Sequence, residues 1–114
     1  MEKSIQNKSF QFAVRIVNLY KYLQAEYQDY VISKQLLRCG TSIGANVAES
    51  QQAQSRNDFI SKLNIALKEA YETDFWLRLL HETQYIDQKS FQSIITDCIE
   101  LEKLLISIIN TAKK

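Results

Sequence analysis

The sequence contains no proline, only two glycines and a single histidine in 114 residues. Proline and glycine mark most turns and strand ends, so their scarcity argues against a fold of many short strands and favours long helices. Basic and acidic residues nearly balance, at 14 and 13, which argues against binding nucleic acid through a strong overall positive charge. A chain of this length can build one core without disulfides or metal ions, so we expect a single domain over residues 1–114.

The sequence also lacks the apolar segments that direct a protein to secretion or into a membrane. The first ten residues hold no apolar run of the kind found in secretory signals, and no apolar stretch approaches the 18 residues of a membrane span. Cys39 and Cys98 have neither CxxC spacing nor a histidine cluster, so we expect buried free thiols in a reducing compartment. We therefore expect a soluble, cytoplasmic protein without a membrane partner.

Apolar residues recur with helical periodicity in four segments of the chain. The expected helices cover residues 3–23, 33–53, 58–82 and 88–113. Capping residues lie in the connections: Asp29 or Ser33 before the second helix, the Ser55–Asp58 stretch before the third and Asp87 before the fourth. Short connections force neighbouring helices to run antiparallel. The sequence thus predicts an all-α fold, an up-and-down antiparallel four-helix bundle.

The first and third of these helices carry more apolar surface than one bundle core needs. On the first helix, Phe10 and Val14 widen the apolar arc beyond half the circumference, and on the third, Ile65, Tyr71 and Trp76 flank the core stripe. Such an excess points to self-association. The alternative is a wide stripe that is buried entirely within a monomer.

Gly40 and Gly44 stand four residues apart in the second helix, where each costs about 1 kcal/mol relative to alanine. Small residues at this spacing permit close backbone approach, so we expect another helix to cross here, from this chain or a partner. The alternative is a local kink.

The residues do not form a recognisable catalytic or metal site. A di-iron bundle requires Glu-x-x-His motifs, but the residue three positions before His81, the only histidine, is Arg78. The GTSIG stretch lacks both the Lys-Ser/Thr pair and the preceding strand of a phosphate-binding loop. We expect no enzymatic activity, no metal, no cofactor and no small-molecule substrate.

Polar residues in and beside the apolar stripes allow two hypotheses. The first is a groove that contacts phosphate. Its nucleic-acid-binding candidates are Arg38, Lys62, Lys68 and Arg15. The second is a structural polar network, in which Arg38 or Lys62 neutralises Glu49, Glu69 or Glu102, because acids match bases almost one for one. The remaining members of that network are Ser42, Asn46 and Glu72.

The stretch LLRCGTSIGANVAES (36–50) and the stretch DFISKLNIALKEAYETDFWLRLL (58–80) resemble the 23S rRNA intervening-sequence protein family, also called four-helix bundle proteins. FQFAVRIVNLYKYL near the start resembles that family's first helix. Ser50 departs from the pattern, since many relatives carry glycine there, and this leaves the end of the second helix open. The positions that fall in the family motif are Arg38, Asn46, Glu49, Lys62, Lys68, Glu69 and Glu72.

The resemblance implies a ring-like homopentamer of up-and-down bundles, encoded within inserted segments of large-subunit rRNA genes. Related accessory proteins of diversity-generating retroelements form strongly basic pentamers that bind nucleic acid and a reverse transcriptase. We therefore expect a non-enzymatic homo-oligomeric scaffold whose partner is RNA or a nucleic-acid-processing protein. The alternative is a protein–protein interaction module with no nucleic-acid role.

Overall fold

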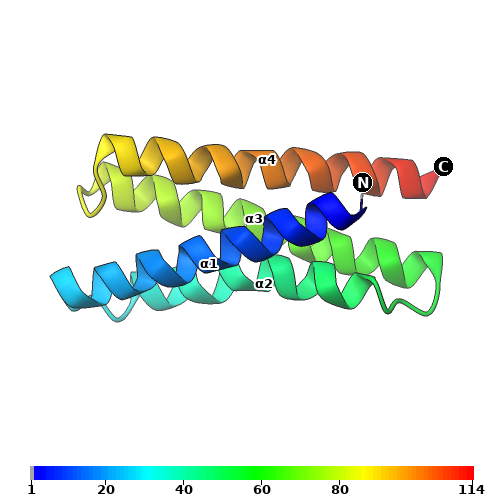
Figure 1. Ribbon diagram of the computed structural model, residues 1–114, viewed down its shortest axis with the longest axis horizontal. Coiled ribbons are helices and arrows are strands. Elements are labelled where there is room, and N and C mark those ends of the chain that lie inside the picture. Colours follow the sequence, from blue (N-terminus) through cyan, green and yellow to red (C-terminus); the bar gives the residue numbers. More distant parts are fainter. Residues whose placement is uncertain (1) are drawn as a thin grey trace.

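The computed structural model describes residues 2–114, with side chains from Ser4 onward, and consists of four long helices. They are α1 (Glu2–Tyr27), α2 (Ile32–Ser50), α3 (Arg56–Glu82) and α4 (Gln88–Lys113). Successive helices run antiparallel along a rod 45 Å long, and both termini lie at the same end (Figure 1). Each helix packs against two others, so that α1 and α3 occupy opposite corners. The predicted up-and-down four-helix bundle is confirmed.

The observed helices differ from the predicted ones mainly where two of them end. Helix α1 continues to Tyr27, four residues beyond its predicted end, because no helix-breaking residue follows Leu23. Helix α2 stops at Ser50 rather than at residue 53. Beyond Ser50 the backbone amides of residues 51–53 each bond to the carbonyl three residues earlier, which tightens the chain into a turn.

Side-chain caps fix the helix starts close to where the sequence places them. The Ser55 hydroxyl accepts a hydrogen bond from the amide of Asp58 at 3.0 Å, and Asp87 accepts one from the amide of Ser90 at 2.7 Å. Before α2, the Asp29 carboxylate accepts the amides of Val31 and Ser33. These bonds satisfy amides that lack a partner within the first turn of a helix.

The core contains one apolar stripe from each helix, and the widest stripe belongs to α4. Its buried apolar residues are Phe91, Ile94, Ile95, Cys98, Leu101, Leu105, Ile108 and Ile109. Cys39 and Cys98 are buried free thiols, as predicted. None of the helices in the described part of the chain has the length and apolar character needed to cross a membrane.

The two glycines of α2 mark a close crossing with α1. A Cβ atom at Gly40 would lie 2.7 Å from Cγ1 of Ile16, and one at Gly44 would lie 3.2 Å from the backbone oxygen of Ser9. Both glycines remain within the continuous helix α2. The close backbone approach expected at these glycines therefore occurs within the chain, between α1 and α2.

Candidate functional site

Arg38 of α2 forms a charged cluster with two glutamates of α3. Its guanidinium donates to the Glu69 carboxylate at 3.2 Å and also to the carboxylate of Glu72. Glu72 accepts a further hydrogen bond from the indole N–H of Trp76 at 3.0 Å. The bonds from Trp76 and then from Arg38 lower the pKa of Glu72, and the bond to Glu72 raises the pKa of Arg38. Both charged states are therefore held firmly at neutral pH.

A second ion pair links the same two helices toward their other end. Lys62 of α3 lies 3.0 Å from a carboxylate oxygen of Glu49 on α2, and this bond raises the pKa of Lys62. Between the two ion pairs, Ser42 and Asn46 bond to carbonyl oxygens of their own helix, at 2.7 and 2.8 Å. The charged residues on the polar face of α2 therefore form ion pairs with α3, whereas the uncharged polar residues between them form hydrogen bonds within α2.

Arg15 lies on another face of the bundle, between α1 and α4. Its guanidinium donates to Asp97 at 2.6 Å and to the hydroxyl of Ser93 at 2.9 Å. Nearby, Lys8 pairs with Glu100 at 3.2 Å. Arg15 therefore does not join Arg38 and Lys62 in one groove, and each of the three already contacts a carboxylate.

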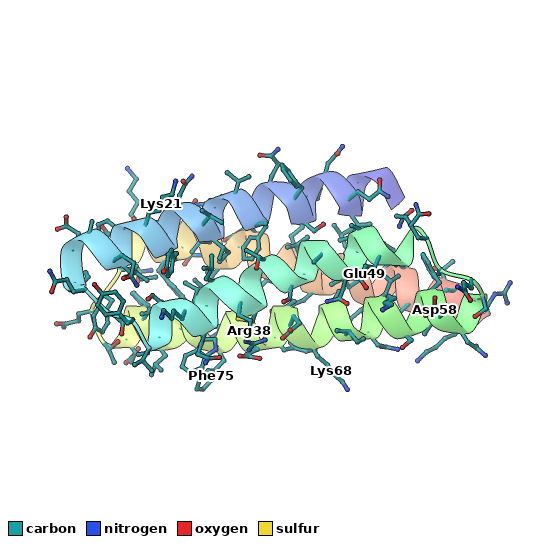
Figure 2. The ribbon with its side chains drawn as sticks, turned by 90° about the horizontal axis from the view of Figure 1, so that it is seen from below. Lys21, Arg38, Glu49, Asp58, Lys68 and Phe75 are labelled. Atoms are coloured by element: carbon teal, nitrogen blue, oxygen red, sulfur yellow. The ribbon has the colours of Figure 1, made fainter. Side chains whose placement is uncertain are left out.

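Lys68 differs from the other three candidate cations. It is exposed on α3, and no ion pair within the described chain includes it. Figure 2 shows Lys68 and Phe75 pointing away from the bundle along the outer edge of α3. Of the residues singled out for phosphate contact, Lys68 is the one whose charge needs no displacement of a carboxylate.

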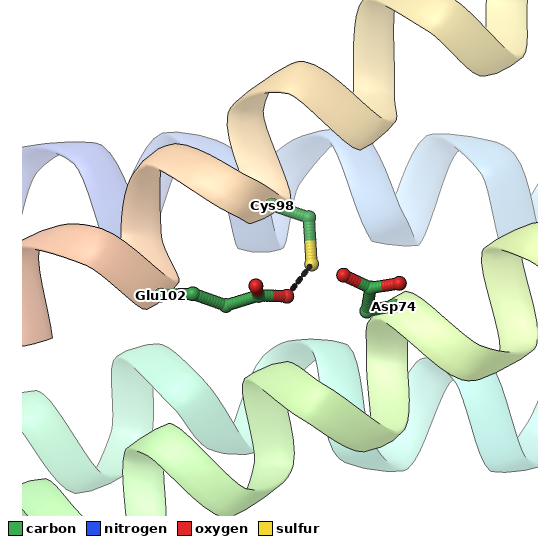
Figure 3. A group of neighbouring side chains, drawn as sticks. All are labelled: Asp74, Cys98 and Glu102. Atoms are coloured by element: carbon green, nitrogen blue, oxygen red, sulfur yellow. Dashed lines mark hydrogen bonds between the residues drawn. The ribbon is translucent and has the colours of Figure 1, made fainter. Parts of the chain in front are cut away.

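Glu102 lies apart from these ion pairs, in a buried cluster between α3 and α4 (Figure 3). The Cys98 thiol lies 3.7 Å from one of its oxygens, and Asp74 faces it from α3. Burial, together with the adjacent Asp74, raises the pKa of Glu102 to about 8. Of the three glutamates that the network hypothesis offers to Arg38 or Lys62, the structure pairs Glu69 with Arg38 and Glu49 with Lys62, whereas Glu102 pairs with neither cation.

Asp74 was not among the predicted site residues, although its position in the sequence carries a signal. Asp74 follows Ala70 by four residues and precedes Leu77 by three, so helical periodicity places it beside the core stripe of α3. In the structure it pairs with Arg78 at 2.5 Å, one turn further along. The charge of Arg78 opposes the effect of Asp74 on the pKa of Glu102.

The three groups of this cluster could in principle ligate a metal ion, because their ligand atoms lie within 4.8 Å of one another. The chemistry of the cluster favours a shared proton instead. Burial strongly raises the pKa of the Cys98 thiol, and the raised pKa of Glu102 keeps its carboxyl protonated at neutral pH. A metal ion would have to displace these protons and compete with Arg78 for Asp74.

A hollow of about 510 Å³ lies where α1 ends and α3 connects to α4. Tyr22, Tyr27 and Tyr85 line it, and the Tyr27 and Tyr85 rings meet edge to face at 4.8 Å. His81 borders the hollow while its ring stacks on Phe91 at 4.2 Å. The described lining of this hollow is partly aromatic. It does not hold a nucleophile in contact with a general base, as a hydrolytic active site would.

Comparisons with known proteins agree with the resemblance found in the sequence. The family model described as "23S rRNA-intervening sequence protein" matches residues 1–107. A crystal structure from Bacteroides thetaiotaomicron, described as a protein with unknown function from the S23 ribosomal protein family, is 62% identical to this chain. The match covers 92% of this chain and 97% of that one, with a TM-score of 0.91. No match was found among curated proteins.

Proposed function

The chain belongs to the 23S rRNA-intervening sequence protein family, and from this premise we propose that it acts as a non-enzymatic, homo-oligomeric scaffold. The observation that carries the proposal is the apolar surface left uncovered on α1 and α3. Phe10 is 64% exposed and Phe75 is 58% exposed, and Val14, Ile65 and Tyr71 are exposed beside them. Large apolar side chains gathered on two helices mark surfaces that a partner covers.

Five copies is the subunit number that the family resemblance implies. Native mass spectrometry on the full chain, purified without nuclease, tests both the assembly and its partner in one spectrum. We expect a single homo-oligomer, with five subunits as the leading value. A monomer at micromolar concentration would refute the scaffold.

The exposed ammonium of Lys68 favours RNA as the partner, because a phosphate can bind this group without displacing a carboxylate. In a five-membered ring Lys68 would occur five times, so even a chain of net charge +1 would present a repeated cation. Arg38, Lys62 and Arg15 would contribute only where phosphate displaces their carboxylates.

Salt dependence separates RNA binding from an interaction module that uses proteins alone. If five Lys68 side chains contact a single strand, the logarithm of the binding constant should fall with the logarithm of salt concentration with a slope of about −3.5. Lys68→Gln should flatten this slope, while Lys103→Gln, at an exposed lysine of α4, serves as the matched control. An intact oligomer that binds no RNA at low salt would instead favour the protein-interaction module.

A further inference from the structure

The hollow of about 510 Å³ at one end of the bundle gathers three tyrosines from two separate segments. Tyr22 and Tyr27 belong to the last part of α1, and Tyr85 belongs to the connection between α3 and α4. Both segments lie at the end of the bundle opposite the two termini (Figure 1). Tyr22 is 46% exposed and Tyr27 is 45% exposed, so their rings contribute little to the core. Exposed rings that converge on one hollow suit a binding site.

The three rings are nearly perpendicular to their neighbours. The ring of Tyr27 meets that of Tyr22 at an angle of 75° and that of Tyr85 at an angle of 76°, with centroids 6.2 and 4.8 Å apart. Rings in this arrangement can present more than one aromatic face to a guest in the hollow. The face of an aromatic ring carries partial negative charge, which attracts a cation.

The charged groups around the hollow are acidic. Glu82 and Asp87 line it, and the pKa of Tyr22 is raised, first by the neighbouring Tyr27 and also by Glu26 and Asp87. None of these three carboxylates takes part in an ion pair within residues 4–114. No lysine or arginine of the described chain lines the hollow. The hollow is therefore complementary to a cation and unfavourable for phosphate.

Glu82 is the carboxylate best placed to pair with a guest. The Asp87 carboxylate already lies 2.7 Å from the amide nitrogen of Ser90, and this bond, with Lys89 nearby, lowers the pKa of Asp87. Glu82 is exposed at the last residue of α3, and no helix cap of the described chain uses its carboxylate. Asp87 therefore contributes negative charge at a distance, whereas Glu82 can contact a guest directly.

Backbone hydrogen bonds fix the connection that carries Tyr85. The amide of Tyr85 donates to the carbonyl oxygen of Leu80 at 2.9 Å, and the amide of Gln84 donates to that of His81 at 3.0 Å. These are the two bonds of a Schellman motif, and Gln84 has the left-handed φ of 70° that the motif requires. A rim that is already ordered loses little conformational freedom when a guest binds.

Among organic cations, the lining favours a guanidinium group. A guanidinium is planar, stacks on aromatic faces and donates up to five hydrogen bonds. The Glu82 carboxylate and the side-chain amide oxygen of Gln84 are acceptors in the lining. A quaternary ammonium could use the rings but has no donor for these acceptors.

The charge of the lining also favours an arginine within a peptide over free arginine. Free arginine carries an α-carboxylate, and the described lining offers no lysine or arginine to pair with it. In a peptide that carboxylate is replaced by a neutral amide, so only the guanidinium charge remains to be matched.

We propose that this hollow binds an arginine side chain of a partner protein, with the guanidinium against the tyrosine rings and bonded to Glu82. The site is distinct from the proposed RNA contact, because RNA would meet the cation Lys68 whereas this hollow offers carboxylates. It also requires no particular number of subunits, since all of its residues come from one chain.

A blocked tripeptide, acetyl-Gly-Arg-Gly-amide, tests the site by NMR titration of the full chain labelled with ¹⁵N. We expect saturable shifts of the amides of Tyr22, Tyr27 and Tyr85, with a dissociation constant of about 1–10 mM for a few exposed contacts. The matched peptide with citrulline, which is similar in shape but uncharged, should bind about fivefold more weakly or worse. Equal binding of the two peptides, or no saturation by about 50 mM, would overturn the proposal.

Two further probes distinguish other guests of the same hollow. Free arginine should bind no more tightly than the blocked peptide, and tighter binding would assign the hollow to the amino acid instead of a partner protein. Adenosine carries a base without a phosphate, so it tests whether the rings stack on RNA. Stronger binding of adenosine than of the arginine peptide at these residues would also overturn the proposal.

Substitutions at exposed positions test the two parts of the site. Tyr27→Leu removes the ring shared by both pairs, and Glu82→Gln removes the charge but keeps the shape, so each should weaken peptide binding about threefold or more. The matched controls are Tyr30→Leu, at an exposed tyrosine outside the hollow, and Glu100→Gln on α4, which should bind as the wild type does. Unchanged binding by Tyr27→Leu and Glu82→Gln, in chains that remain helical by circular dichroism, would contradict the site.

Discussion

Glu102 should make the stability of this bundle fall as pH rises, and Glu102→Gln should remove that dependence. In the folded chain burial and the facing Asp74 raise the pKa of the carboxyl to about 8. In the unfolded chain a glutamate titrates near pH 4.3. The unfolded state therefore releases the proton first, and the stabilisation that is complete below pH 4.3 is lost progressively until about pH 8.

The size of the effect follows from the separation of the two pKa values. Each pH unit between them is equivalent to about 1.4 kcal/mol, which sets an upper limit of about 5 kcal/mol. Arg78, already paired with Asp74, can compensate part of the new charge, so we expect a fall of about 3 kcal/mol between pH 5 and pH 9. Such a loss is a large share of the 5–15 kcal/mol typical of a domain.

Urea denaturation followed by circular dichroism, at fixed protein concentration from pH 5 to pH 9, measures this fall. Glu102→Gln stays neutral throughout and keeps an N–H donor for Asp74, so its free energy of unfolding should be nearly flat over that range. The matched control is Glu100→Gln, at a half-exposed position of α4 paired with Lys8, which should retain the wild-type slope. Parallel curves for the wild type and Glu102→Gln would refute the assignment of the proton to this carboxyl.

Three further predictions test other parts of the fold. Gly40→Ala should destabilise the chain by about 1–3 kcal/mol despite the better helix propensity of alanine, and Gly44→Ala should cost less because its nearest contact is longer, as thermal unfolding would show. Gln84 has a φ of 70°, so Gln84→Gly should raise the free energy of unfolding by up to about 1 kcal/mol in urea denaturation. Cys39, whose pKa burial raises to about 11, and Cys98 should react with a thiol reagent at pH 8 only after unfolding; rapid labelling of the folded chain would contradict their burial.

Sequence periodicity was sufficient to predict the four helices, because each long segment repeats apolar residues on one side, with Glu102 as an interruption in the fourth. The start of α4 is predicted to the residue, since Asp87 has the character of a cap and its carboxylate accepts a backbone amide. The end of α1 was missed by four residues because Gln28, where the chain turns, adopts a φ of 52° without being glycine. A left-handed residue of this kind carries no composition signal.

The partners of the polar residues were harder to predict from the sequence than the helices. The balance of acids and bases predicted that Arg38 or Lys62 pairs with Glu49, Glu69 or Glu102, and the structure pairs Arg38 with Glu69. The sequence pattern could not tell that Glu102 faces Asp74 rather than a cation, because that depends on the rotation of α4 against α3. The pairing of Arg15 with Asp97 likewise joins residues 82 positions apart and follows only from the packed fold.

The near-neutral net charge of the chain reflects ion pairs between neighbouring helices, in which a basic side chain of one helix contacts a carboxylate of the next. The cations Arg38, Lys62 and Arg15 each bond to a carboxylate on the neighbouring helix, so they join helices within one copy. Exposed ion pairs contribute little to stability and weaken with salt, whereas apolar contacts persist at high ionic strength. Assembly through the exposed apolar residues of α1 and α3 should therefore be insensitive to salt, whereas the proposed contact with RNA should weaken as salt is added. The proposed assembly and the proposed RNA contact can therefore be tested separately, by varying the salt concentration.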